Sequence, residues 1–399
     1  ALPSAFFNIS EIAVFGFPII YNFTMAIPFI LTPVVLTLIS YIATASGLVP
    51  VVTQSVDWTV PILFSGYKAT GSISGSILQL INLVVGICIY IPFIRRSEQK
   101  ETAEFQQIVR QMEQDMEAGE SSGNLPLFLS HKYPYNYYAK TLSLDLKNAL
   151  HRGQVDFFYQ PQISREGNIH GIEALLRWQH PVTGYISPPV IFALAYEGGF
   201  LNELNSYLLN RACNDARILD PQLENDLILS INISAKQIEE NGFFDNTYMV
   251  LKETQLSRIH FALEITERSA MKITDSLMDD IKRLQNNGIS FSLDDFGMGH
   301  NSILYLQEGI FDEVKLDGHL VTQLPGNGRS RDIISGIIRM ARSLDLRILA
   351  EYVETKEQRD ILAELGCGFY QGYYYSRPLP MDKLVEYIKT AGNTAEGQR

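Results

Sequence analysis

Polar side chains stand at or near the carboxyl ends of several short, β-prone runs in the second half of the chain. The run "ISFSLDD", from Ile289, ends in two adjacent acids, Asp294 and Asp295, which repel each other unless a positive charge neutralises them. Similar runs are "GIEALLRW", "LILSIN", "FALEIT", "EVKLDG", "LRILAEYV" and "FYQG". Their polar residues are Glu173, Asn232, Glu264, Asp294, Asp295, Lys315, Asp317, Glu351 and Gln371.

Several carboxylates that converge with one amide require a cation. The set offers oxygen ligands and contains neither Cys nor His, so Mg²⁺ or Mn²⁺ fits better than zinc. Two adjacent acids can serve two metals, and a two-metal site suits in-line displacement at phosphorus. Such metals lower the pKa of a bound water from about 15.7 towards ~7. Lys315 would help to hold that water and balance the charge.

The elements that must position these groups alternate between strand and helix. Amphipathic stretches such as "DSLMDDIKRLQNNG" lie between most of the β-prone runs, which indicates a parallel sheet. About eight such runs in roughly 250 residues favour an α/β fold of the TIM-like (β/α)8 barrel type, whose catalytic groups lie at the carboxyl ends of the strands. Small residues share a strand face with three of the polar groups: Ser230 with Asn232, Ala262 with Glu264, and Ser292 with Asp294.

Charge and cysteine usage exclude two classes of function. The formal net charge is -12, which argues against charge-driven binding of DNA. The three cysteines, Cys88, Cys213 and Cys367, are widely spaced, so neither a disulfide framework nor a zinc site is expected.

The first part of the chain is apolar. Residues 27–49 and 76–94 contain no charged residue, and each run is long enough to cross a bilayer. Arg95 and Arg96 follow the second run, which predicts a multi-pass membrane protein with its carboxyl-terminal part in the cytoplasm. A buried helical hairpin is the alternative. The segment between the runs is either an outer loop or a re-entrant segment. The chain starts at Ala1 without a signal-peptide pattern, so we expect further sequence upstream.

Residues 97–130 are predicted to form a helical linker. An apolar stripe at helical spacing is followed by the helix-breaking "GESSGN". Either a solvated connector helix or a signalling helix that pairs between two chains would show this pattern. The stripe consists of Phe105, Ile108, Val109, Met112 and Met116. We expect the globular domain at 131–390 and a disordered tail at 391–399.

Seven ordered motifs, "EALLRW", "INIS", "EITE", "DDFG", "VKLD", "AEYVE" and "QGY…SRPLP", resemble the EAL-domain cyclic-di-GMP phosphodiesterases. The resemblance covers about Tyr138 to Ile388 and implies a homodimer formed through this domain. It implies one metal on Glu173, Asn232, Glu264 and Asp294, and a second on Asp294, Asp295 and Glu351. Lys315 and Glu351 would position or deprotonate the water.

The same resemblance implies roles for further residues. Arg177 would contact a substrate phosphate, with Gln371 and Asp317 also on the substrate side. Glu267 would hold the loop that follows Asp295 and take part in dimer contact and regulation. Glu354 would be a supporting acid. For Asp317, Arg177 and Glu354, a structural ion pair is the alternative.

Two stretches depart from the family pattern. Met298, His300 and Asn301 stand where the family commonly has Thr or Ala, Tyr and Ser, and Tyr352 replaces a glycine beside Glu351. A tyrosine is expected to need an ordinary β conformation and more space than glycine. These changes leave the ligand residues intact and would affect loop order, substrate access or dimer contact.

Residues 1–96 resemble the carboxyl-terminal part of the membrane subunit (enzyme IIC) of lactose/cellobiose-type sugar phosphotransferase transporters. The stretches that carry the resemblance are "ALPSAFFNISEIAVFGFPIIYNFTMAIPFIL", "WTVPILFSGYKATG" and "SISGSILQLINLVVGICIYIPF". Glu11 matches the sugar-contacting Glu of that family, although Ile12 replaces its usual Pro. Glu11 is therefore a sugar ligand, a relic or a polar residue of a helix bundle. A sugar or other phosphotransferase components would be the partners.

The sequence thus predicts a membrane-anchored phosphodiesterase that converts cyclic di-GMP to linear pGpG with two divalent cations. A catalytically weak cyclic-di-GMP receptor and a regulatory tail of a sugar transporter are the alternatives.

Overall fold

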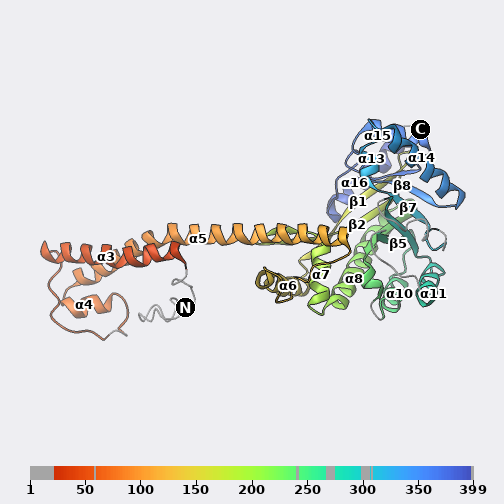
Figure 1. Ribbon diagram of the computed structural model, residues 1–399. Helices are drawn as coiled ribbons and strands as arrows, with labels where there is room; N and C mark the ends of the chain where they lie inside the picture. The colour runs from red at the N-terminus through yellow and green to blue at the C-terminus, as the bar shows by residue number, and fades with distance from the viewer. Residues whose placement is uncertain are drawn as a thin grey trace. The chain divides into compact units, whose positions relative to one another are not determined.

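The computed structural model describes residues 22–57, 60–239, 242–266, 275–297, 306 and 309–396 (Figure 1). The chain divides into two compact units, Ala1–Gln107 and Ile108–Arg399. Each unit is described by itself below. Glu11 lies outside the described residues.

The described part of the first unit consists of helices with exposed apolar side chains. It contains α3 (Phe23–Ala45), α4 (Phe64–Thr70) and the first part of α5 (Ile73–Ser122). The Asn82 amide donates to Ser40 Oγ at 2.9 Å, which joins α3 to α5. By length and composition, α3 and α5 are both candidates to cross a membrane.

The helix bounds differ from the predicted spans 27–49 and 76–94. Asn22 caps α3 by accepting hydrogen bonds from the backbone N–H groups of Thr24 and Met25, so this helix begins before residue 27. It ends at Ala45, because Gly47 turns the chain with a φ of 75°. The second run lies wholly inside α5, which continues without a break through most of the predicted linker.

The last turns of α5 belong to the second unit and form part of its core. Ile108, Val109, Met112 and Met116 are all buried, and Met112 is 0% exposed. Glu113 accepts a hydrogen bond from the Ser187 backbone N–H at 3.1 Å, and Asp115 accepts one from the Tyr133 hydroxyl at 2.8 Å. This part of the apolar stripe therefore belongs to the core of its own globular unit, which neither alternative for the linker had included.

The second unit is built around a closed barrel of eight strands, as expected from the sequence. Hydrogen-bonded neighbours run β1-β2-β4-β5-β6-β7-β8-β9 and back to β1. The strands are β1 (Val155–Ser164), β2 (Ile169–His180), β4 (Leu227–Ile233), β5 (Ile259–Thr266), β6 (Ser290–Phe296), β7 (Glu313–Leu316), β8 (Arg347–Ala350) and β9 (Phe369–Tyr370). A further short strand, β3 (Gly184–Ile186), pairs with the end of β2.

One strand corrects the expectation of a parallel barrel. β1 pairs antiparallel with both β2 and β9, whereas the other barrel strands pair in parallel. The reason is local: β1 and β2 are joined by a few residues with no helix between them, and so short a connection can only form a hairpin.

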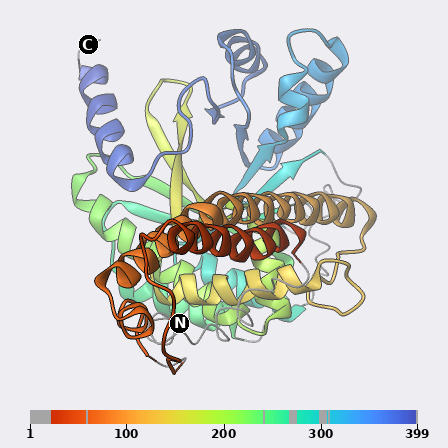
Figure 2. The same cartoon turned by 90° about the vertical axis from the view of Figure 1, so that its left-hand side faces the viewer.

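Helices cover the outside of the barrel (Figures 1 and 2). Apolar strand residues such as Leu229, Leu263 and Val314 are buried, while the alternate side chains point inward. The helices are α6 (Asn136–His151), α7 (Pro188–Glu197), α8 (Leu201–Leu219), α9 (Ala235–Glu239), α10 (Phe243–Thr254), α11 (Asp275–Gln285), α13 (Gly318–Thr322), α14 (Gly328–Ser343), α15 (Lys356–Leu365) and α16 (Met381–Glu396). A 3-10 turn, Asp220–Gln222, follows α8.

The end of α16 corrects the predicted tail. The helix continues to Glu396, so most of residues 391–399 is helical, and 397–399 lie outside the described residues. Ala391, Ala395 and Glu396 favour helix, whereas Gly392, Asn393 and Thr394 do not, so composition alone did not indicate that the helix continues.

Candidate active site

A β-bulge brings the two adjacent acids together. Successive side chains of a regular strand point to opposite faces, so Asp294 and Asp295 could not both face the barrel mouth. The pairing of β6 with β7 shifts register between Leu293 and Phe296, and Asp295 adopts a left-handed φ of 55°. As a result, carboxylate oxygens of Asp294, Asp295 and Glu351 lie within 4.8 Å of one another.

Lys315 contacts four carboxylates, two of which belong to this group. Its side chain is 0% exposed, and its ammonium lies 2.6 Å from Glu264, 2.9 Å from Glu351, 3.3 Å from Glu173 and 3.4 Å from Asp294. These residues come from β2, β5, β6 and the end of β8, so the barrel assembles groups that are far apart in the sequence. The predicted ring of polar strand ends is therefore one compact cluster.

Amide side chains orient Glu173 within this cluster. Asn232 Nδ2 donates to Glu173 Oε1 at 2.6 Å, and Gln371 Nε2 donates to Glu173 Oε2 at 2.6 Å. Gln371 also donates to Gln160 and accepts from Gln162, both on β1. The sequence reading missed Gln160 and Gln162, since they lie inside a strand that runs opposite to its neighbours.

The cluster contains more negative charge than Lys315 can neutralise. Burial raises the pKa values of Glu264 and Glu351 well above the ordinary range, although Lys315 opposes the shift, and burial raises that of Asp294 in the same way. Burial also acts on Glu173, but Lys315 and the two amides hold its pKa below the usual value. Burial would lower the pKa of Lys315, yet the surrounding carboxylates raise it, so the ammonium stays charged.

This donor set fits divalent cations. Four carboxylates share one ammonium, Asp295 adds a fifth carboxylate beside Asp294 and Glu351, and Glu264 Oε1 is buried without a hydrogen-bond partner among the described residues. An oxygen-rich site with unpaired buried acid groups is suited to hard cations such as Mg²⁺ or Mn²⁺. The identity of the ion is part of the proposal below.

Arg177 lies at the barrel mouth between aromatic rings. Its guanidinium carbon is 5.3 Å from the Tyr185 ring and 5.9 Å from the Phe158 ring, and Nη1 donates to the Leu176 carbonyl oxygen at 2.9 Å. No carboxylate pairs with Arg177 in the described part of the chain, so the structure does not favour the ion-pair alternative for this residue.

The remaining predicted site residues do not belong to the cluster around Lys315 or lie outside the described residues. Asp317 caps α13 by accepting from the His319 N–H at 2.8 Å, and Glu354 is exposed. Glu267, Met298, His300 and Asn301 lie outside the described residues.

Glu313 was not among the predicted residues. It is 3% exposed on β7, accepts from Ser292 Oγ at 3.3 Å and lies 3.4 Å from Arg347 Nε. Its position two residues before Lys315 on the same strand face was the available signal. Burial raises the pKa of Glu313 despite Arg347 and Lys315.

Tyr352 differs from its expected conformation. It has a left-handed φ of 52° instead of an ordinary β value, and its ring packs against Gly318. Left-handed backbone costs a non-glycine residue roughly 1–2 kcal/mol, which the surrounding structure must offset. Burial, and then the charges of Glu351, Asp295, Glu173 and Asp294, raise the pKa of the Tyr352 hydroxyl.

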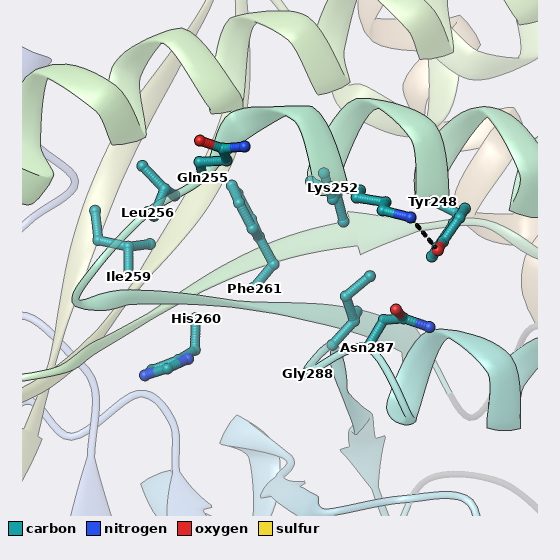
Figure 3. A pocket seen from close by; sticks show the side chains of 11 residues that line it. Tyr248, Lys252, Gln255, Leu256, Ile259, His260, Phe261, Asn287 and Gly288 are labelled. Atoms are coloured by element: carbon teal, nitrogen blue, oxygen red, sulfur yellow. Dashed lines mark hydrogen bonds between the residues drawn. The ribbon is translucent and has the colours of Figure 1, made fainter.

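A separate pocket of about 300 Å³ lies at the opposite end of the barrel (Figure 3). It lies between α10 and the amino-terminal ends of β5 and β6, where Lys252 contacts the Tyr248 hydroxyl at 3.0 Å. It contains none of the clustered acids, so it is separate from the reactive site.

A closed barrel with a lysine-centred acidic site at the carboxyl ends of its strands is the arrangement of a TIM-like barrel enzyme. The chain belongs to the EAL domain family, whose model matches residues 143–378. The resemblance found in the sequence of the globular domain is therefore confirmed.

Curated relatives match this same domain. The cyclic di-GMP phosphodiesterase NbdA of Pseudomonas aeruginosa is 35% identical over 246 residues, covering 61% of this chain and 31% of NbdA. The bifunctional diguanylate cyclase/cyclic di-GMP phosphodiesterase MucR of the same organism is 35% identical over 245 residues, covering 61% of this chain and 36% of MucR. The chain thus spans about a third of the length of these relatives.

A solved structure of the PaMucR phosphodiesterase in complex with c-di-GMP is also similar. It shares 35% identity at a TM-score of 0.57, and the match covers 61% of this chain and 99% of that chain.

Proposed function

We propose that this protein hydrolyses one phosphodiester of cyclic di-GMP to give linear pGpG. The observation that carries the proposal is the bulge in β6, which places Asp294 and Asp295 beside Glu351 in a cluster centred on Lys315. The relatives named as cyclic di-GMP phosphodiesterases support the choice of substrate. In the reaction, a water oxygen bonds to phosphorus while the bond to the leaving ribose oxygen breaks and that oxygen takes a proton.

We assign the residues of the cluster to two roles, the binding of divalent cations and the transfer of a proton. Glu173, Asn232, Glu264 and Asp294 would hold one divalent cation, and Asp294, Asp295 and Glu351 a second. When bound, these cations would supply positive charge to the phosphate and lower the pKa of the attacking water.

The other roles are proton transfer, charge balance and substrate binding. Glu351 accepts the water proton, a role that suits a carboxyl whose pKa burial raises. Lys315 balances the carboxylates and positions the water. Arg177 binds a substrate phosphate, Gln371 and Asp317 support the substrate side, and Glu354 is a supporting acid.

The test is nucleotide turnover by the full chain in detergent, with Mg²⁺ or Mn²⁺ and with EDTA. We expect pGpG only with the metal, and a loss of at least about 100-fold in kcat for Glu351→Gln, the usual scale for a general base. Arg152→Gln, on an exposed turn, is the matched control. Tight binding of cyclic di-GMP without formation of linear pGpG would contradict the proposed enzymatic activity and favour a cyclic-di-GMP receptor.

We also propose that α3 and the apolar part of α5 anchor the protein in the inner membrane, with the EAL domain in the cytoplasm. Their length and composition and the Arg95–Arg96 pair support this. Cell fractionation tests the anchor: recovery in the soluble fraction, without detergent, would contradict it.

Residues 1–96 are further proposed to derive from a sugar phosphotransferase membrane subunit, with Glu11 as a possible sugar contact. A change in cyclic-di-GMP turnover on adding lactose or cellobiose, lost in Glu11→Gln, would support that origin.

We also propose that the EAL domain forms a homodimer in which Glu267 holds the loop after Asp295. A monomer in detergent at micromolar concentration would contradict it.

A further inference from the structure

Tyr352 is fixed in place from both sides. Its neighbours are held by backbone hydrogen bonds: Glu351 N–H donates to the Leu316 carbonyl at 3.4 Å, and Val353 N–H donates to the Gln371 carbonyl at 3.0 Å. A left-handed tyrosine persists only where the surrounding structure imposes it. Its orientation is therefore set by the same backbone that positions Glu351.

The ring of Tyr352 rests on Gly318 at the start of α13. A Cβ added to Gly318 would lie 2.1 Å from Cδ2 of the ring, so only glycine leaves room for it. Although this contact covers part of the ring, Tyr352 is 59% exposed. One side of the ring therefore packs against Gly318, and the rest of the ring is exposed to solvent; we call this exposed side the free face.

The side chain of Tyr352 lies close enough to the reactive cluster for the charges of its carboxylates to raise the pKa of the hydroxyl. Tyr352 directly follows Glu351, and its hydroxyl has no hydrogen-bond partner among the residues that the structure describes. Tyr373 and Tyr374, which follow Gln371, are also exposed, and the Tyr374 N–H donates to the Val353 carbonyl at 2.9 Å. Exposed aromatic side chains therefore gather at this part of the barrel mouth.

The proposed substrate contains two purine bases that an exposed aromatic ring can bind. Carboxylates, Lys315 and Arg177 address phosphates and cations, and an exposed aromatic ring adds a flat apolar surface for a nucleobase. Aromatic rings bind bases by stacking, which does not require hydrogen bonds from the tyrosine hydroxyl. We propose that Tyr352 is a substrate-positioning residue whose free face stacks on one purine base of the cyclic dinucleotide. The inference rests on the proposed function and adds a base-binding element to it.

The test compares Tyr352→Phe, Tyr352→Leu and Tyr352→Gly in the full chain in detergent. Stacking is worth about 1–3 kcal/mol per base on substitution, or roughly 5- to 150-fold in affinity. We expect the Leu and Gly variants to raise KM for cyclic di-GMP about tenfold, with kcat within about threefold. Phe keeps the ring and should stay within about twofold. Tyr137→Leu, which removes an exposed tyrosine from α6, is the matched control.

Two further measurements separate stacking from a structural role. Turnover of methyl p-nitrophenyl phosphate, which carries no purine, should be unchanged in Tyr352→Leu. Gly318→Ala should displace the ring and raise KM in the parent chain, but have little effect in Tyr352→Gly, where no ring meets the new methyl group. Additive effects of the two substitutions would contradict the contact as described.

The outcomes distinguish this inference from the proposed function. Hydrolysis of cyclic di-GMP with an unchanged or lower KM in Tyr352→Leu overturns the stacking role and leaves the phosphodiesterase intact. If the parent chain binds cyclic di-GMP without cleaving it, the proposed phosphodiesterase activity is wrong. The Kd values of the Tyr352 variants for cyclic di-GMP then test the stacking role, because a loss of stacking should raise Kd. A parent chain that neither binds nor cleaves the nucleotide overturns both.

Discussion

Lys315 shows how one residue can hold an acidic cluster together. Its ammonium is fully buried and lies within 3.4 Å of four carboxylates. Neutralising a buried charge that pairs with others leaves its partners uncompensated, so a lysine in this position serves stability as well as chemistry.

Substitution of Lys315 by Met should lower the free energy of unfolding by about 3–5 kcal/mol without metal, because buried carboxylates lose their partner. Mg²⁺ should recover part of that loss by supplying positive charge. Urea unfolding with and without Mg²⁺ measures both effects. Lys147→Met, which removes an exposed lysine 3.9 Å from Glu203, is the control. Equal stability of Lys315→Met and the control in EDTA would contradict the account.

The raised carboxyl pKa values predict a pH dependence with a definite sign. Glu264, Glu351 and Asp294 keep protons in the metal-free fold at pH values where the unfolded chain has lost them. The stability of the metal-free protein should therefore fall as the pH rises from the ordinary carboxyl pKa through the raised values. Divalent cations need the deprotonated groups, so the rise in Tm caused by Mg²⁺ should grow with pH over that window. A Tm increment independent of pH from 5 to 8 would contradict this expectation.

At the scale of the element, the bulge in β6 decides what the Asp-Asp pair can do. A regular strand would send the two carboxylates to opposite faces, whereas the left-handed Asp295 turns both towards Glu351. Asn tolerates left-handed backbone at least as well as Asp, while a β-branched residue does not.

Substitution of Asp295 by Asn should leave stability within about 0.5 kcal/mol but weaken metal binding, because a charged ligand is lost while the bulge remains. Substitution by Val should also destabilise the protein by roughly 1–2 kcal/mol, the cost of left-handed backbone. Thermal unfolding and Mg²⁺ titration of the two variants separate the effects. If Asp295→Val is as stable as Asp295→Asn, the conformation at this position is not strained.

At the scale of the whole molecule, the core of the globular unit includes residues that precede residue 131, the domain start predicted from the sequence. Met112 and Phe128 are each 0% exposed, and both lie before residue 131. Glu197 accepts hydrogen bonds from the N–H groups of Phe128 and Leu129, each at 2.8 Å. The end of α5 and the segment after it therefore complete the core of this unit.

A fragment of residues 108–399 should unfold cooperatively, whereas a fragment of residues 131–399 should be less stable because it loses these buried side chains. Burial of a single large apolar side chain is worth about 1.5–3 kcal/mol, and each kcal/mol shifts Tm by about 2–4 °C in a domain of this size. Calorimetry of the two fragments measures the difference. Equal Tm values would show that the α5 segment packs on the unit without stabilising it.

The sequence alone indicated a barrel of about eight strands and most of the polar residues that cluster at its mouth. Period-two patterning and short runs with polar ends depend on local chain geometry, so Glu173, Glu264 and Lys315 could be assigned to one barrel mouth. The tertiary structure alone decided the reversal of β1, the burial of Met112 and the left-handed backbone at Asp295 and Tyr352. These features arise from contacts between distant segments, such as the ring of Tyr352 against Gly318, and local pattern carries no record of such contacts.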